Sequence, residues 1–145
     1  MDIMDKFLTE KEKELILQLF SKDYFAAKLG ISIVEFEAGM ALAKMTVSDD
    51  MLNGAGVANG GVIFTLADFA LAVAANTIGE FMSLTLGMNI NYIKSALCGE
   101  TIMAKAICEA KSNKIISCNV AVTNQNGEII ASAQGISYIT SKRPG

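Results

Sequence analysis

The stretch from Asn53 to Asn76, NGAGVANGGVIFTLADFALAVAAN, constrains the fold of this chain more than any other. It opens with glycines and continues, from about Gly60 to Ile78, as a helix that is apolar on nearly every side. A helix of this kind must be covered over most of its surface. The stretch therefore predicts one long central helix, buried by the rest of the chain and along one edge by a second subunit.

The remaining sequence supplies strands that can cover this helix. Apolar and polar residues alternate in a strand pair within 31–48, which turns at Ala38-Gly39, and in four further runs at about 83–94, 101–111, 115–123 and 129–140. The Asn126-Gly127 pair is typical of a tight hairpin. Because the connections are short, we expect a mostly antiparallel sheet of the α+β class, curved around the central helix.

The N-terminal part, 1–29, is expected to be a helical extension of a single domain that spans residues 1–145. Thr9 is followed three residues later by Glu12, which is a capping-box pattern. Apolar residues then recur at helical spacing over about Glu10–Ser21, and a short helical piece ends at Gly30. A length of 145 residues suits one domain.

Composition and charge narrow the class of partners. Hydrophobic residues make up 52% of the chain, which favours burial between subunits as a homodimer or as a dimer of dimers, a homotetramer. A net charge of −3 argues against a nucleic-acid partner. The most apolar stretch is short for a bilayer and carries Asp68 near its centre, so we expect no membrane partner. The acidic start of the chain has no long apolar core, which predicts a cytoplasmic protein.

Histidine is absent and cysteine is sparse. The absence of histidine excludes a histidine-containing metal site, a Ser-His-Asp triad and a Cys-His dyad. Cys98, Cys108 and Cys118 are odd in number and form no C-x-x-C pair. Each falls in or beside a predicted strand, so we expect all three to be reduced core residues. No metal site is predicted.

One face of the central helix is small and polar. Gly61, Thr65, Asp68, Ala72 and Asn76 are spaced by four, three, four and four residues and therefore share one side. This stripe predicts a surface that another group approaches closely. Asp68, at its centre, either has a structural role, in which it bonds a buried donor or reaches a surface rim, or is kept partly dry so that it acts as a base or nucleophile.

The start of the same helix offers a second chemical feature. The first N–H groups of a helix lack internal partners, and its dipole favours negative charge there. The glycines of Asn59-Gly60-Gly61 either let a ligand oxygen approach those groups or merely make the turn. A helix N-terminus that holds a carbonyl oxygen, with a carboxylate further along, suits attack on an acyl group. A thioester is the natural candidate, because its thiolate leaves without the help of a histidine acid.

These residues resemble the helix region of hotdog-fold acyl-CoA thioesterases, specifically those of the phenylacetic-acid-pathway type. The likeness covers about Leu29 to Tyr138 and includes the segment NINYIKSALCGETIMAKA. The positions that match the family's helix motif are Asn53, Gly54, Gly56, Gly60, Gly61, Phe64, Leu66, Ala67, Asp68, Ala70 and Asn76.

The resemblance implies an active site at the interface of a dimer whose sheets pair edge to edge, and often a tetramer. The backbone N–H of Gly60 or Gly61 from one subunit would polarise the thioester carbonyl. Asp68 of the partner subunit would act as general base or nucleophile, and Asn53 would help to hold the water or the acyl group. The substrate would be a small or medium acyl-CoA, aromatic ones included. Coenzyme A is then part of the substrate, and no cofactor is expected.

Two positions depart from the family's pattern. The usual histidine before Gly-Gly is Asn59, which we include in the catalytic set because asparagine can still donate a hydrogen bond. The usual Arg-Pro pair is Lys94-Ser95, where the lysine keeps a positive charge for a phosphate but loses the bidentate fork. Lys94, Ser95, Thr65 and Asn76 form the predicted substrate- and CoA-binding set.

Two other functions compete with thioester hydrolysis. A hotdog domain can bind acyl-CoA as a sensor or carrier without hydrolysing it; the missing histidine favours this alternative and the presence of Asp68 opposes it. A hotdog dehydratase or hydratase is opposed by the absence of histidine.

Overall fold

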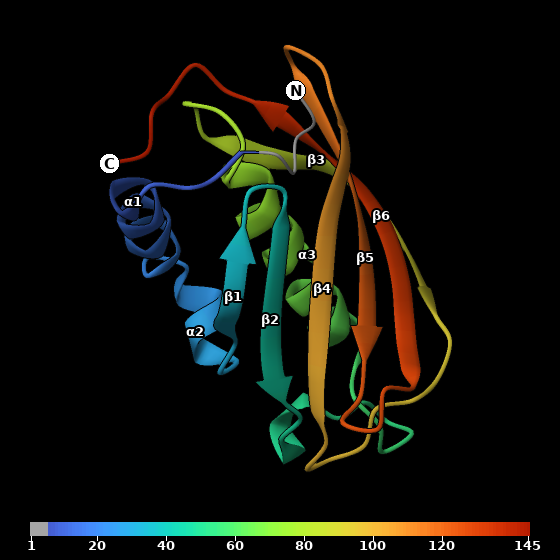
Figure 1. Cartoon of the computed structure of the whole chain (residues 1–145). Coiled ribbons are helices and arrows are strands. Elements are labelled where there is room, and N and C mark those ends of the chain that lie inside the picture. Colours follow the sequence, from blue (N-terminus) through green and yellow to red (C-terminus); the bar gives the residue numbers. More distant parts are fainter. Residues whose placement is uncertain (1–5) are drawn as a thin grey trace.

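The computed structural model describes residues 6–145 as one six-stranded antiparallel sheet curved around a long helix (Figure 1). The helix, α3 (Gly60–Asn76), lies against the inner face of the sheet. The strand order is β1-β2-β4-β5-β6-β3, so β1 and β3 form the two edges. The strands are β1 (Ser32–Glu37), β2 (Met40–Thr46), β3 (Ser83–Tyr92), β4 (Thr101–Lys111), β5 (Ile115–Thr123) and β6 (Ile129–Ile139). The predicted fold class is confirmed.

The N-terminal helices are short and individually capped. In α1 (Glu10–Phe20), the amide of Glu12 donates to the hydroxyl of Thr9 at 3.1 Å, and the amide of Thr9 donates to the Glu12 carboxylate at 2.8 Å. This is the predicted capping box. A second helix, α2 (Tyr24–Lys28), follows, and a 3-10 turn, η2 (Asp49–Met51), precedes the glycine-rich loop. Residues 1–5 of the predicted extension lie outside the described residues.

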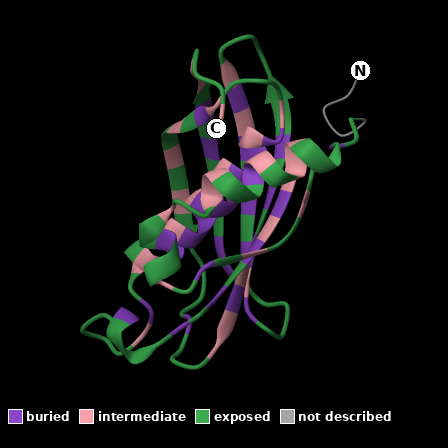
Figure 2. Cartoon of the chain, turned by 90° about the vertical axis from the view of Figure 1, so that its left-hand side faces the viewer, coloured by how far each residue is buried: buried purple, intermediate pink, exposed green. Residues whose placement is uncertain are grey.

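The core lies between α3 and the inner face of the sheet. Nine residues of α3 are buried, and buried and exposed residues alternate along the central strands (Figure 2). At Gly135 on β6 the Leu71 side chain of α3 packs directly on the strand, because a Cβ at this position would lie 2.6 Å from the Leu71 Cδ1 atom. A glycine here leaves room for that side chain. None of the helices in residues 6–145 combines the length and apolarity needed to span a bilayer.

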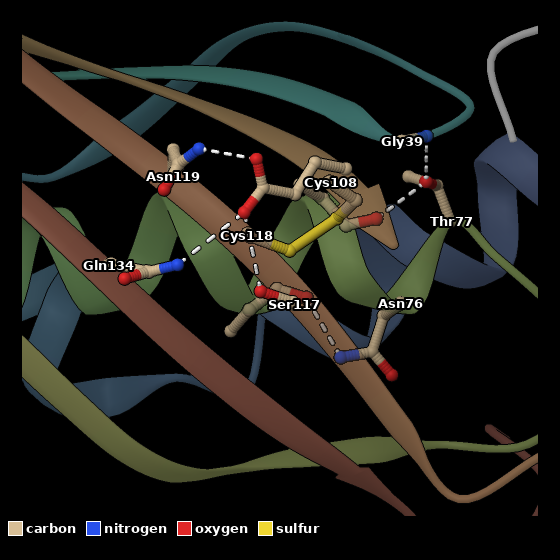
Figure 3. The surroundings of a disulfide bond; sticks show 11 residues. Gly39, Asn76, Thr77, Cys108, Ser117, Cys118, Asn119 and Gln134 are labelled. Carbon is tan, nitrogen blue, oxygen red and sulfur yellow. Dashed lines mark hydrogen bonds between the residues drawn. A yellow bond between two sulfur atoms is a disulfide. The ribbon is translucent and has the colours of Figure 1, made fainter. Parts of the chain in front are cut away.

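The C-terminal end of α3 is tied to the first hairpin. The Thr77 hydroxyl donates to the carbonyl of Ala74 at 2.6 Å and accepts from the amide of Gly39 at 2.7 Å (Figure 3). Gly39 lies in the turn between β1 and β2 and has a φ of +76°, which is readily adopted only by glycine. The Thr77 hydroxyl therefore bonds both a carbonyl of the last helical turn and the amide of the hairpin turn.

The prediction of three reduced core cysteines is wrong in two respects. Cys108 and Cys118 are buried, but they face each other across β4 and β5 and form a disulfide, with Cα atoms 3.9 Å apart (Figure 3). Their pairing depends on strand register, which composition does not reveal. Cys98 is exposed between β3 and β4. Its thiol donates to the Asp49 carboxylate at 3.0 Å, and this bond raises the pKa of Cys98.

The disulfide predicts how many thiols the protein offers to an alkylating reagent. After denaturation without a reductant, only Cys98 should be alkylated, and mass spectrometry should show one adduct per chain. The same sample treated first with a reductant should carry three adducts, which serves as the control. Three adducts without reductant would show that Cys108 and Cys118 are thiols.

Candidate active site

The predicted polar stripe is the side of α3 that the sheet leaves open. Gly61, Thr65, Asp68, Ala72 and Asn76 are half-buried or exposed, whereas most of the helix's other residues are buried. Hollows border this helix beside its first turn and beside its middle. We call the one beside its first turn the N-terminal pocket, and the one beside its middle the Asp68 groove.

The N-terminal pocket has a volume of about 300 Å³ and brings together four predicted site residues: Asn53, Gly60, Lys94 and Ser95. The hydroxyl of Tyr92, at the end of β3, donates to the carbonyl of Gly60 at 2.8 Å. A Cβ at Gly60 would lie 3.1 Å from the Tyr92 ring. The ring therefore fits closely over a glycine at this position and would have to shift for a larger residue.

Asn53 shapes the loop that borders this pocket. Its side-chain oxygen accepts from the amides of Ala55 and Val57 at 2.9 and 3.3 Å. Its backbone amide donates to the carbonyl of Val57 at 2.7 Å. Within residues 6–145 its Nδ2 group has no protein acceptor, so the amino half of the side chain is free to donate to a ligand.

Asn59 caps the helix rather than pointing a donor into the pocket. Its Oδ1 atom accepts from the amide of Gly61 at 2.7 Å. Of the two amides predicted to contact a carbonyl oxygen, that of Gly61 is thus engaged, while that of Gly60 has no acceptor in the described chain. Sequence reasoning missed this role, although asparagine is a preferred N-cap residue and could have signalled it.

Lys94 is paired within its own chain. It forms an ion pair with Glu128 in which both side chains are exposed. The hydrogen bond from Lys94, assisted by one from Asn124, holds the pKa of Glu128 below its ordinary value. A phosphate that binds Lys94 therefore competes with Glu128.

The Asp68 groove has a volume of about 680 Å³ and lies between the N-terminal helices and the start of β3. Asp68 and Ala72 of α3 line it together with Thr85 of β3. The hydroxyl of Thr85 donates to Asp68 Oδ1 at 2.7 Å. Sequence reasoning missed Thr85, which lies 17 residues beyond Asp68. Its polar side chain on the inner face of a strand is the only signal that could have found it.

The other two predicted binding residues have partners within α3 and β3. Asn76 donates to the carbonyls of Ala72 and Ser83 at 2.8 and 3.2 Å and accepts from the amide of Ser83 at 3.0 Å. Thr65 donates to the carbonyl of Gly61 at 2.8 Å. The chain does not bring these two residues into the N-terminal pocket with Lys94 and Ser95.

Gly60 and Asp68 do not meet within one chain. They are eight residues apart on the same helix, which separates them by about 12 Å along its axis. The hollows that they line share no residue. One small reacting group cannot contact both in the same subunit.

A curved antiparallel sheet around one helix, with a free amide at the helix start and a carboxylate on its open side, places this protein in the hotdog-fold thioesterase class. Sequence comparison gives the same result. The Thioesterase superfamily profile matches residues 55–131, which is more than half of the chain. The protein belongs to this superfamily, and the predicted resemblance is confirmed.

Individual relatives support this assignment. A putative esterase of Archaeoglobus fulgidus is 35% identical over 120 residues, covering 83% of this chain and 77% of the relative. The acyl-coenzyme A thioesterase PaaI of Escherichia coli is 30% identical, covering 83% of this chain and 85% of the relative. A solved structure of E. coli PaaI, from the phenylacetic acid degradation operon, has a TM-score of 0.89 at 27% identity and covers 94% of this chain and 98% of its own. A Streptococcus mutans protein solved with acetyl-CoA has a TM-score of 0.72 at 34% identity, covering 78% and 90%.

Proposed function

We propose that the protein hydrolyses the thioester of a small or medium acyl-CoA to the free acid and coenzyme A. The observation that carries this proposal is the hydrogen-bonded Asp68–Thr85 pair on the open side of α3. The thioesterase name of the E. coli relative and the acetyl-CoA of the S. mutans structure lend support. The E. coli protein comes from an operon for phenylacetic acid degradation, so aromatic acyl groups are among the candidate substrates.

The proposed site is shared by two subunits of a homodimer or of a dimer of dimers. Its support is the separation of Gly60 from Asp68 along one helix, since an antiparallel second α3 can bring the two together. β3 is an edge strand whose outer backbone groups are available to pair with another strand. Pairing of β3 with its copy would continue the sheet and set the two helices side by side.

In the proposed reaction, each group has one task. The Gly60 amide holds the thioester oxygen at the helix N-terminus, where negative charge is favoured. The carboxylate of Asp68 from the other subunit takes a proton as the oxygen of water bonds to the carbonyl carbon, and the C=O electron pair moves onto oxygen. The C=O bond then re-forms, the C–S bond breaks, and the proton passes from Asp68 to the departing thiolate.

Thr85 positions the carboxylate in this scheme. Its hydroxyl binds Oδ1, which fixes the side chain and leaves Oδ2 to face the water. Lys94 and Ser95, beside the free amide of Gly60, are proposed to contact coenzyme A.

The test is a panel of acyl-CoAs that differ in length and ring content, with thiol release followed by a thiol-reactive dye. Hydrolysis of at least one member, with saturation by substrate, is the expected result. Acyl-CoA binding in calorimetry without thiol release would overturn the proposal and favour the sensor or carrier alternative.

The replacement Thr85→Val tests the positioning role. Valine has the shape of threonine but cannot donate to Asp68. A hydrogen bond to a charged group contributes about 1.5–3 kcal/mol, so kcat should fall about 10- to 100-fold with a smaller change in KM. Thr85→Ser retains the hydroxyl and should retain most of the wild-type kcat. An unchanged kcat for Thr85→Val would remove Thr85 from the mechanism.

A further inference from the structure

Two aromatic side chains of α2 are exposed beside Asp68. Tyr24 is 78% exposed and Phe25 is 61% exposed, and both line the Asp68 groove. The fold does not use them as core, because Ala26 is the one buried residue of α2. Large aromatic groups gain much free energy when they are covered. Their position therefore points to a molecule that covers them in the groove.

The segment that carries these rings is firmly held. Its N-cap, Asp23, accepts from the amide of Ala26 at 3.0 Å, and the carbonyl of Ala26 accepts from the amide of Ile31 at 3.0 Å. Just before it, Phe20 packs edge-to-face on Phe69 of α3, with ring centroids 5.5 Å apart. The backbone that carries Tyr24 and Phe25 is thus held relative to α3, which lowers the cost of ordering this segment around a ligand.

The opposite wall of the groove is also apolar. Met82, the half-buried residue just before β3, lines it. Ala72, one turn beyond Asp68, adds a small side chain on α3. The volume of about 680 Å³ falls within the range of small-molecule sites. The groove therefore offers apolar walls with a carboxylate beside them.

We infer that Tyr24 and Phe25 form the acyl-selecting wall of the site, so that a bulky apolar acyl group lies between them and Met82. This inference rests on the proposed thioesterase function. If Asp68 acts at the thioester carbon, the acyl chain begins next to Asp68, and the groove is the apolar space that adjoins it. The phosphates of coenzyme A are suited to Lys94, which lies in the other hollow.

The wall predicts selectivity for acyl size. An acetyl group has one methyl to bury, whereas a hexanoyl group adds four methylenes that can reach the aromatic rings. A single methylene in an apolar pocket can change kcat/KM by about 10-fold or more. Wild type should therefore prefer hexanoyl-CoA to acetyl-CoA, and much of this preference should depend on Tyr24 and Phe25.

The experiment compares kcat/KM for hexanoyl-CoA and acetyl-CoA in wild type, Phe25→Ala and the double variant Tyr24→Ala/Phe25→Ala. The hexanoyl-to-acetyl ratio should fall about 10-fold or more in the double variant. Phe25→Leu, which keeps an apolar but smaller side chain, should give an intermediate ratio. The control is Leu17→Ala on α1, whose side chain is exposed and lines neither hollow; it should keep the wild-type ratio.

An unchanged hexanoyl-to-acetyl ratio of kcat/KM in the double variant would overturn the inference that Tyr24 and Phe25 select the acyl group. An equal loss of kcat/KM on both substrates leaves the ratio unchanged and would overturn it too. A change of oligomeric state in sedimentation would also overturn it and assign the groove to a subunit contact. Wild type that hydrolyses no acyl-CoA would instead refute the proposed function, so the two failures are distinguishable.

Discussion

Replacing Asp68 by asparagine is expected to slow thioester hydrolysis by about 10²–10⁴-fold, the usual contribution of a general base. Asparagine keeps the shape of the side chain, and its oxygen can still accept from Thr85, so the fold should persist. What it loses is the ability to take a proton from water. No histidine exists in the chain to take over that task.

The measurement is kcat on the best acyl-CoA of the panel, with folding checked by circular dichroism. Glu35→Gln, which neutralises an exposed acid on β1, is the matched control and should keep the wild-type kcat. A general base should contribute about 10²–10⁴-fold to the rate. If Asp68→Asn retains more than about a third of the wild-type kcat, then Asp68 is only a structural carboxylate.

The replacement Gly61→Val is expected to lower turnover by at least about 10²-fold, because a displaced cap would move the neighbouring Gly60 amide and so remove the proposed oxyanion donor. A Cβ at Gly61 would lie 3.0 Å from Asn59 Oδ1, so the cap would have to move. The added methyl groups would also stand on the open side of α3. Gly61 is exposed and valine is a better helix former than glycine, so the protein should remain folded.

Two inactive variants should restore each other if the site is shared. Co-expressed Asp68→Asn and Gly61→Val chains should form mixed dimers in which one site carries both defects and the other carries none. With random pairing, about a quarter of wild-type activity should return. Activity no greater than that of the separate variants would mean that each site lies within a single chain.

The parts of the fold that follow from local periodicity could be predicted from the sequence. The run from Gly60 onward gives α3 because its apolar residues lie within a few positions of one another, whereas the capping role of Asn59 was missed. The strands follow from alternation, and the fold then follows because a helix this apolar needs a sheet around it. The Cys108–Cys118 disulfide could not be predicted in this way, since it depends on which residues of β4 and β5 come to face each other.

The candidate site was predictable only along the helix. The spacing of Gly61, Thr65 and Asp68 gave the open side of α3, because helical geometry fixes it. The partners of these residues depend on tertiary contacts: Thr85 reaches Asp68 from an edge strand, and Glu128 reaches Lys94 from the last hairpin. Asn76 fits the family's motif, yet both ends of its amide bond to neighbouring backbone, which no motif could reveal.

The close contact between Leu71 and Gly135 couples the packing of the core to the position of Asp68. Leu71 lies three residues beyond Asp68, so the depth at which it meets β6 also sets the height of the carboxylate above the sheet. A Cβ at position 135 would displace the Leu71 side chain, and any movement of this turn of α3 that made room for it would move Asp68 as well. Substitutions between α3 and β6 should therefore lower kcat more readily than they lower the melting temperature. A thermostable redesign of this core would need to preserve the separation between α3 and β6 at Gly135.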